Sequence, residues 1–252
     1  MTSHNRVALV TGGGTGIGRA SALALQKTGF QVIVTGRRAE PLEETVALGQ
    51  SDHSAIVAIA TDVAQGREVK RLFSEIELRF SRLDVLFNNA GVGAPRVSLE
   101  ELSEEDWRKV VDINLTGSFL CAQAAFALMK RQSPQGGRII NNGSISAHAP
   151  RPNTVAYTAT KHAITGLTKS LALDGRPFKI AASQIDIGNA ETAISQQFKT
   201  GTPQANGQLM IEPVIDSRYC GEAVAYMAGL PLEANVLNMT LMATNMPFVG
   251  RG

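Results

Sequence analysis

The chain alternates short apolar runs with longer amphipathic segments, and this alternation limits its possible folds more than any other feature. Seven runs read as strands buried on both faces, at residues 6–11, 31–36, 55–61, 83–89, 137–142, 179–186 and 236–242. Longer segments with helical periodicity lie between them, at 16–28, 39–49, 65–80, 103–132, 156–174 and 217–229. Because buried strands that alternate with helices form parallel sheets, we expect an α/β fold with helices on both faces of one sheet.

Composition limits the domain count and the partners. The chain has 252 residues, 44% of them apolar, and a formal net charge of +2. A chain of this length without a Pro/Gly/Ser linker favours a single domain over residues 1–252. The charge is too small to predict a nucleic-acid partner, and no apolar run reaches the length of a membrane span, so we expect neither partner.

The same composition predicts the compartment and the absence of a metal. The polar residues 1–6 lack the long apolar region of a secretory signal. Cys121 and Cys220 form no disulfide framework, and the four histidines show no ligand pattern. We therefore expect a cytoplasmic protein with no bound metal.

A glycine-rich turn, "VTGGGTGIGRASA" (10–22), joins the first strand to the first helix. In sheets of this kind the phosphates of a nucleotide bind at this turn, where free N–H groups of the helix face the negative charge. Gly12 and Gly16 let the backbone approach phosphate, and Gly18 lets the helix pack closely on the strand. The spacing is T-G-x-x-x-G-x-G from Thr11, which differs from the more common G-x-G-x-x-G.

With this spacing the chain resembles the classical short-chain dehydrogenase/reductase family, and further motifs of that family follow in order. "NNAG" (88–91) ends the fourth strand, Asn114 lies in "VDINLTG", and Ser144 in "NNGSIS" precedes the Y-x-x-x-K of Tyr157 and Lys161. The resemblance implies a three-layer, doubly wound (Rossmann) fold with a seven-stranded parallel sheet. It also implies oxidoreductase activity on a small-molecule carbonyl or alcohol and a homo-oligomer, commonly a tetramer.

Tyr157 and Lys161 stand one helical turn apart on the same face of a helix. A lone pair with this spacing is usually a surface pair, but here the resemblance assigns Tyr157 the role of general acid and base. Lowering the pKa of a phenol from about 10 to about 7 takes about 4 kcal/mol. One ammonium about 4 Å away supplies about that energy at an effective dielectric of about 20, so we expect Lys161 to lower the pKa of Tyr157.

Two further residues complete the expected catalytic group. The Ser144 hydroxyl can donate and accept, and the resemblance implies that it holds the carbonyl or alcohol oxygen of the substrate. Ser146 is the other candidate, but its spacing from the tyrosine is less favourable. Asn114 resembles the asparagine that bends a helix and holds a water connecting Lys161 to solvent, and an Asn inside a helix is otherwise unfavourable.

The end of the second strand indicates the cofactor. "VTGRRAE" places Arg37 and Arg38 where an acidic residue would bind the ribose 2′-hydroxyl of NAD. Because a guanidinium suits a 2′-phosphate, we favour NADP(H) over NAD(H), although both arginines could simply be solvated. The expected cofactor-binding residues, several of them implied by the resemblance, are Gly12, Gly14, Thr15, Gly16, Ile17, Gly18, Arg37, Arg38, Asp62, Val63, Asn89, Ala90, Gly91, Tyr157, Lys161, Gly188, Ala190 and Thr192.

The sequence departs from the family pattern after the sixth strand. In "IDIGNAETAI" Ile187 replaces the usual proline, while Gly188 and Thr192 stay in place. Loss of the proline frees the backbone that leads into the weakly periodic stretch 189–213, which we expect to be a substrate lid. The apolar tail at 246–252 also departs from the pattern, and we expect it at a subunit contact.

Together these patterns predict an NADP(H)-dependent oxidoreductase that interconverts a carbonyl and a secondary alcohol on a small or medium-sized molecule. A 3-ketoacyl-thioester reductase of fatty-acid-synthesis type shares all the motifs and stays open. A non-catalytic nucleotide-binding sensor is a further alternative, which the complete catalytic group disfavours. Residues 91–98, 147–153 and 189–213 should contact substrate. Arg96 and Arg151 could hold an acidic substrate but are interpreted as solvated loop residues, and His148 as a loop residue and not a catalyst.

Overall fold

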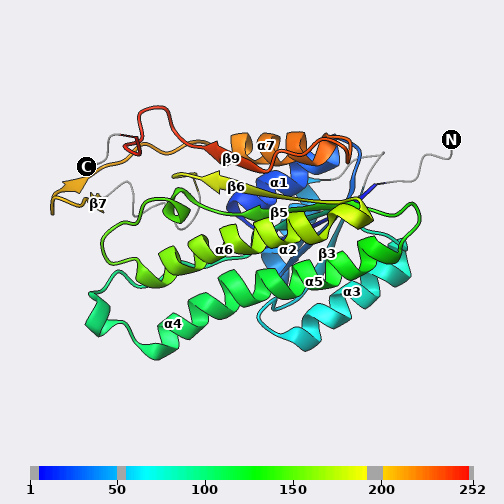
Figure 1. The fold of residues 1–252 in the computed structure, drawn as a ribbon, viewed down its shortest axis with the longest axis horizontal. Helices are drawn as coiled ribbons and strands as arrows, with labels where there is room; N and C mark the ends of the chain where they lie inside the picture. Colours follow the sequence, from blue (N-terminus) through cyan, green and yellow to red (C-terminus); the bar gives the residue numbers. More distant parts are fainter. Residues whose placement is uncertain (1–5, 50–54, 192–200, 250–252) are drawn as a thin grey trace.

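One sheet of seven parallel strands forms the centre of the protein, in the order β3-β2-β1-β4-β5-β6-β9 (Figure 1). The structure, a computed structural model, describes residues 6–49, 55–191 and 201–249. The predicted seven-stranded parallel sheet is confirmed, and each strand overlaps its expected range. The strands are β1 Val7–Thr11, β2 Gln31–Gly36, β3 Ile56–Ala60, β4 Val85–Asn88, β5 Gly137–Asn142, β6 Ile180–Ile187 and β9 Asn238–Leu241.

Helices cover both faces of this sheet, as the alternation predicts. Successive residues of β1 alternate between the two cores: Val10 packs with Leu25 and Val224 on one face, while Leu9 packs with Leu72 and Ala125 on the other. The first core lies under α1 and α7, and the second lies under α3 and α5 (Figure 1). The helices are α1 Gly16–Lys27, α2 Ala39–Leu48, α3 Gly66–Phe80, α4 Glu104–Val111, α5 Gly117–Arg131, α6 Val155–Asp174 and α7 Ser217–Gly229.

The segment predicted as one helix at 103–132 is interrupted. Ser103 caps α4 by accepting a hydrogen bond from the Asp106 amide at 3.0 Å. A π-helical turn, η2 (Asp112–Thr116), then separates α4 from α5 and contains Asn114. The periodicity of the sequence continues through such a turn, so the pattern alone does not reveal it.

This helical segment also passes a simple test for a membrane span. By length and composition alone, Glu104–Arg131 is long and apolar enough to cross a membrane. However, 44% of its most apolar stretch is buried inside the protein. Cys121 and Ala122 of α5 are fully buried against the sheet. The apolar residues of α5 therefore pack in the core of the fold.

The stretch expected as a lid contains a short hairpin that the sequence did not predict. β7 (Thr202–Pro203) pairs with β8 (Leu209–Met210) in antiparallel fashion. The strands have two residues each, which is too short for a recognisable alternation. Residues 192–200 lie outside the described part of the chain.

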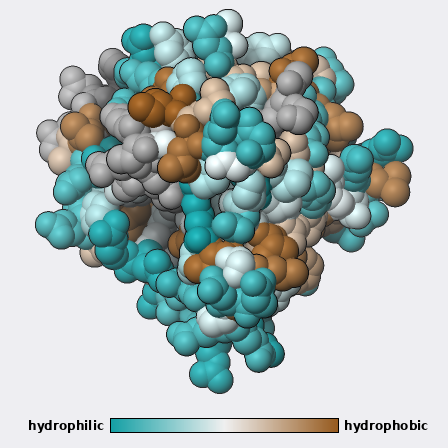
Figure 2. Space-filling view, turned by 90° about the vertical axis from the view of Figure 1, so that its left-hand side faces the viewer, coloured by the Kyte–Doolittle hydropathy of each residue, from teal (hydrophilic) through white to brown (hydrophobic). Residues whose placement is uncertain are grey.

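The carboxyl ends of the strands meet at one edge of the sheet, on the left of Figure 1, where the arrow of β6 points. Figure 2 faces this end of the molecule and shows apolar residues beside a hollow in a largely hydrophilic surface. In open parallel sheets, ligands bind outside the carboxyl ends of the strands. The loops that follow β1, β4, β5 and β6 therefore position the candidate site.

Candidate functional site

The glycine-rich turn follows β1 as predicted. Gly16 has φ +51°, a left-handed conformation that favours glycine. A Cβ on Gly18 would lie 2.1 Å from the main-chain oxygen of Gly12, so only glycine lets α1 pack this closely on the turn. Thr15, at the N-cap of α1, makes no side-chain cap, which leaves the first amides of the helix facing the adjoining cavity. This arrangement suits a phosphate group.

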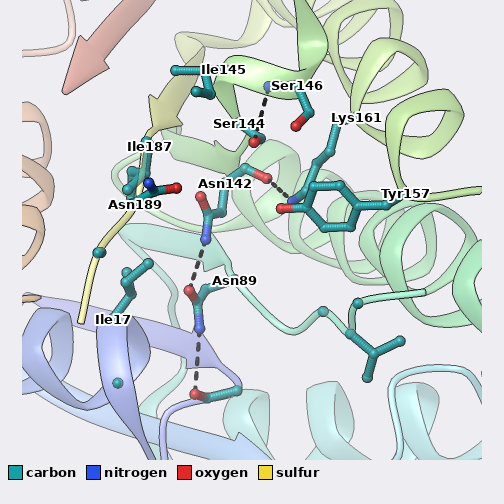
Figure 3. A pocket seen from close by; sticks show the side chains of 18 of the residues that line it. Ile17, Asn89, Asn142, Ser144, Ile145, Ser146, Tyr157, Lys161, Ile187 and Asn189 are labelled. Atoms are coloured by element: carbon teal, nitrogen blue, oxygen red, sulfur yellow. Dashed lines mark hydrogen bonds between the residues drawn. The ribbon is translucent and has the colours of Figure 1, made fainter. Parts of the chain in front are cut away.

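A chain of asparagine side chains connects this turn to the expected catalytic residues. Asn89 donates from Nδ2 to the main-chain oxygen of Thr11 at 2.9 Å, and its Oδ1 accepts from Nδ2 of Asn142 at 2.9 Å. The main-chain oxygen of Asn142 then accepts from Nζ of Lys161 at 2.7 Å. Figure 3 shows this run of contacts from the turn to the lysine. Asn142 was not predicted; its place at the end of β5, just ahead of Ser144, is the signal that could have indicated it.

Tyr157 and Lys161 lie on the same face of α6, as their spacing predicts. Lys161 is 7% exposed, and its Nζ lies 5.4 Å from the centroid of the Tyr157 ring. Both side chains line the same cavity and approach each other in Figure 3. The cation thus sits next to the phenol, in a site where burial weakens screening by water.

Ser144 follows β5 and precedes the 3-10 turn η3 (Ile145–Ala147). It is 6% exposed, and its Oγ accepts a hydrogen bond from the Ser146 amide at 3.1 Å, which orients the hydroxyl. Ser144, Ser146 and Tyr157 line one cavity. The structure therefore brings the predicted serine, tyrosine and lysine together, with the second serine beside them.

Asn114 has a different environment from these three residues. Its side chain is 2% exposed and pairs with the backbone of Val92, accepting from the amide at 2.8 Å and donating to the carbonyl at 3.0 Å. It lies behind the cavity wall and fixes the loop after β4. The departure from α-helical geometry expected at this residue is present, while the predicted water contact to Lys161 stays a prediction.

Two adjoining cavities form a cleft along the carboxyl edge of the sheet. The larger has a volume of about 300 Å³ and is bounded by Ser144, Tyr157 and Lys161. The smaller, about 150 Å³, is bounded by Arg37 and Arg38. The two share wall residues in the glycine-rich turn and the loop after β4, so an elongated molecule could occupy both. Their walls contain these predicted cofactor-binding residues: Gly12, Gly14, Thr15, Gly16, Ile17, Gly18, Arg37, Arg38, Asp62, Val63, Asn89, Ala90, Gly91, Tyr157, Lys161, Gly188 and Ala190.

The remaining predicted residue, Thr192, lies outside the described part of the chain. Ile187, which replaces the family's proline, extends β6 and pairs with Leu241 of β9. It is 4% exposed and also contributes to the wall of the larger cavity. The substitution therefore lets the strand continue to the edge of the site.

The interpretation of Arg151 as a solvated loop residue is wrong. Its side chain is 10% exposed and forms an ion pair with Glu212, whose side chain is 0% exposed. Glu212 also accepts from Nδ2 of Asn189 at 2.8 Å and from Nε2 of Gln204 at 2.9 Å. Arg151 precedes a proline in a polar loop, and its partner is distant in sequence, so the local pattern did not indicate burial. The pair fixes the segment after β8 to the wall of the larger cavity.

Arg96 lies in the same wall and is also less solvated than expected. Burial lowers the pKa of its guanidinium, and the charge of Glu212 opposes that effect. His148 does not line the described cavities but donates to a buried carboxylate, Asp186, at 2.8 Å. In the described residues no group of three or more His, Cys, Asp or Glu side chains could hold a metal ion.

The described part of the C-terminal tail packs on its own chain, and the subunit contact expected for it stays a prediction. Met246 is 4% exposed and packs in one cluster with Ile145 and Ala243. The ring of Phe248 meets that of His148 edge to face, with centroids 6.3 Å apart. Apolar side chains of the tail thus cover the loop that carries Ser144.

Comparisons with known proteins agree with this geometry. Residues 6–202 match the family model for short chain dehydrogenases. A 3beta-hydroxysteroid dehydrogenase of Mediterraneibacter gnavus is 35% identical over 192 residues, which cover 76% of this chain and 68% of that protein.

Two solved structures have the same fold over nearly the whole chain. A 3-ketoacyl-(acyl-carrier-protein) reductase of Brucella melitensis, complexed with NADH, has 25% identity, a TM-score of 0.83 and coverage of 96% and 98%. An actinorhodin polyketide ketoreductase variant with NADPH has 26% identity, a TM-score of 0.84 and the same coverage. The chain belongs to the short-chain dehydrogenase family, whose members are oxidoreductases that act on CH–OH groups with a nicotinamide cofactor.

Proposed function

We propose that the protein is an NADP(H)-dependent oxidoreductase that interconverts a carbonyl and a secondary alcohol on a small or medium-sized substrate. The observation that carries the proposal is the convergence of Ser144, Tyr157 and Lys161 on one cavity wall, next to a glycine-rich turn that suits phosphate. The bound nicotinamide supplies or accepts the hydride. The protein positions the substrate and moves the proton.

Each of the three side chains has a distinct task in this mechanism. The Ser144 hydroxyl holds the substrate oxygen by a hydrogen bond. Tyr157 donates its phenolic proton to that oxygen in reduction and accepts it back in oxidation. Lys161 stabilises negative charge on the phenol oxygen, and the Asn142 carbonyl keeps its ammonium in place at 2.7 Å. Asn114 is proposed to support proton exchange between Lys161 and solvent through a water.

The preference for NADP(H) is supported by the smaller cavity. Arg37 and Arg38 are exposed at its rim, while Glu40, the nearest acid along the chain, is not among its wall residues. Two guanidinium groups favour a 2′-phosphate. We expect Arg37→Ala with Arg38→Ala to raise the KM for NADPH at least tenfold and to leave that for NADH nearly unchanged. Equal changes for both cofactors would contradict the preference.

Oxidation of NADPH in the presence of a carbonyl panel tests the activity, with NADH run in parallel. Tyr157→Phe should lower kcat at least 100-fold without weakening NADPH binding measured by fluorescence, because only the proton donor is lost. Tyr226→Phe, at a tyrosine 58% exposed on α7, is the matched control and should retain full activity. Undiminished turnover in Tyr157→Phe would refute the mechanism. Cofactor binding without turnover of any carbonyl would favour a sensor.

The second candidate is a 3-ketoacyl-thioester reductase, favoured by the similarity to the Brucella melitensis reductase. The two candidates differ in the substrate that the larger cavity accepts. Acetoacetyl-CoA and a matched free β-ketoester, compared by kcat/KM, distinguish them. A clear preference for the thioester would support this second candidate.

We also propose that the protein is a cytoplasmic homotetramer. In Figure 1, α4 and α5 follow each other along one helical segment, and α6 runs alongside it. These helices expose large apolar side chains, including Trp107 at 38%, Phe119 at 44% and Val155 at 41%. Large exposed apolar side chains favour an interface where they form a contiguous patch. Light scattering after size exclusion tests the state, and a monomeric mass at micromolar concentration would contradict it.

A further inference from the structure

A buried carboxylate lies directly behind Ser144. Asp186, near the end of β6, is 0% exposed and accepts four hydrogen bonds. Its Oδ1 accepts from the Ser144 amide at 3.0 Å and from Nε2 of Gln184 at 2.7 Å. Its Oδ2 accepts from Nε2 of His148 at 2.8 Å and from Nδ2 of Asn238 at 2.8 Å.

These four donors match the capacity of an ionised carboxylate. Such a group only accepts hydrogen bonds and has about four lone-pair sites, two on each oxygen. The donors to Asp186 come from β6, from β9 and from both ends of the η3 turn. Burial of a carboxylate is unfavourable unless its bonds are satisfied, and even a satisfied buried charge gives little net stability. A role in stability alone therefore explains this residue poorly.

The contacts of Asp186 define the path of the chain around Ser144. One oxygen holds the amide of Ser144 at the start of the turn, and the other holds the His148 ring just after its end. A Cβ on Gly143 would lie 2.0 Å from Oδ1 of Asp186, so the residue before Ser144 must be glycine for the carboxylate to fit. The segment 144–148 is thus held at both ends by one side chain.

We infer that Asp186 is a positioning residue for Ser144, setting the place of its hydroxyl relative to Tyr157 through the backbone amide. This inference rests on the catalytic role proposed for Ser144. Asp186 itself does not line the described cavities, so it acts through the serine and not on the substrate. A misplacement of about 1 Å at a reacting group can lower a rate about 100-fold.

Amide exchange followed by mass spectrometry tests the positioning without any need for a substrate. In Asp186→Ala the peptide that contains 143–148 should exchange at least tenfold faster than in the wild type. In Asp186→Asn the exchange rate of this peptide should stay close to that of the wild type. The amide oxygen of the new side chain can still accept from the Ser144 amide, and the side-chain amides of Gln184 and Asn238 can rotate to suit it. Ser183→Ala is the matched control: Ser183 lies on the same strand as Asp186, and the change removes its partly buried hydrogen bond to Asn235, a bond that does not involve η3. Unchanged exchange in Asp186→Ala would overturn the inference.

Kinetics test whether the positioning acts through the serine. With the best carbonyl of the panel, Asp186→Ala should lower kcat about 100-fold and leave the Kd for the cofactor within twofold. Asp186→Asn should recover most of that loss, and Ser183→Ala should lower only the Tm. In a Ser144→Ala background, Asp186→Ala should change kcat less than twofold. An equal loss in both backgrounds would refute the role.

Two further results must be told apart: a failure of the proposed function and a failure of the Asp186→Ala variant to fold. If no carbonyl is turned over, the proposed function fails, while the exchange experiment still decides whether Asp186 orders the segment. If Asp186→Ala does not fold, His148→Ala takes its place, since that ring is 44% exposed and its loss frees the end of the turn. This variant should raise exchange and lower kcat about tenfold. Wild-type values of both would overturn the inference.

Discussion

Removal of Arg151 should loosen the attachment of the segment after β8 more than any surface change. Arg151→Met removes the guanidinium that pairs with the carboxylate of Glu212, whose side chain is 0% exposed. Breaking a buried ion pair in this way costs about 3–5 kcal/mol. The amide donors of Asn189 and Gln204 stay in place, so we expect the lower end, about 3 kcal/mol. At about 2–4 °C per kcal/mol for a chain of this size, the Tm should fall by about 6–12 °C.

A double-mutant cycle separates the pair from its surroundings. Glu212→Gln removes the charge but keeps the shape, and the double variant should lose at least about 1 kcal/mol less than the sum of the two single changes. Thermal unfolding at a fixed protein concentration without cofactor measures the shifts. The control is Arg108→Met, in an exposed pair with Glu104 at 71% and 76% exposure, where we expect a shift below about 2 °C. Additive effects within about 0.5 kcal/mol, or an Arg151→Met shift no larger than the control, would refute the reasoning.

The remaining predictions concern a glycine, the two cysteines and an asparagine. Gly18→Ala should abolish cofactor binding in a fluorescence titration, because its Cβ would meet a main-chain oxygen at 2.1 Å; near-normal affinity would contradict the close packing. Burial raises the pKa of Cys121 and of Cys220 to about 12, so neither thiol should react with a disulfide reagent at pH 8 until the protein unfolds. Because the pKa of each thiol in the folded protein lies above its ordinary value of 9.0, the stability that the two thiols contribute is present below pH 9 and is lost as the pH rises toward 12. Urea titrations at several pH values can measure this loss. Asn142→Ala removes the 2.9 Å hydrogen bond to Asn89, a loss of about 1.4 kcal/mol, and should raise the KM for the cofactor about tenfold. An unchanged KM would show that the glycine-rich turn keeps its conformation without this hydrogen bond.

The parts of the fold that depend on local pattern were predictable from the sequence. Continuous apolar runs such as Val7–Thr11 are buried on both faces, and the pattern of burial requires a parallel sheet between helices. Tyr157 and Lys161 lie four residues apart on one helix, so their placement on the same face can be predicted without knowledge of the tertiary structure. The placement of these two side chains was therefore predictable, together with most of the residues that line the cleft.

Features that depend on contacts between distant residues were not predictable. Arg151 and Glu212 are 61 residues apart, and His148 and Asp186 are 38 apart, so no local signal connects either pair. Asp186 lies in a strand that was predicted to be buried, but the sequence does not indicate its distant partners, and Glu212 lies in a weakly periodic stretch where burial was not expected. The bend at Asn114 was expected from the resemblance alone, because the helical pattern continues through the π turn.

The hydrogen bonds of Asn142 have a mechanical consequence. One residue holds the glycine-rich turn through its side chain, by way of Asn89, and the ammonium of Lys161 through its backbone. Asn142 is also the last residue of β5, so the central sheet anchors both contacts. The distance between the turn and the lysine is therefore set by the end of one strand.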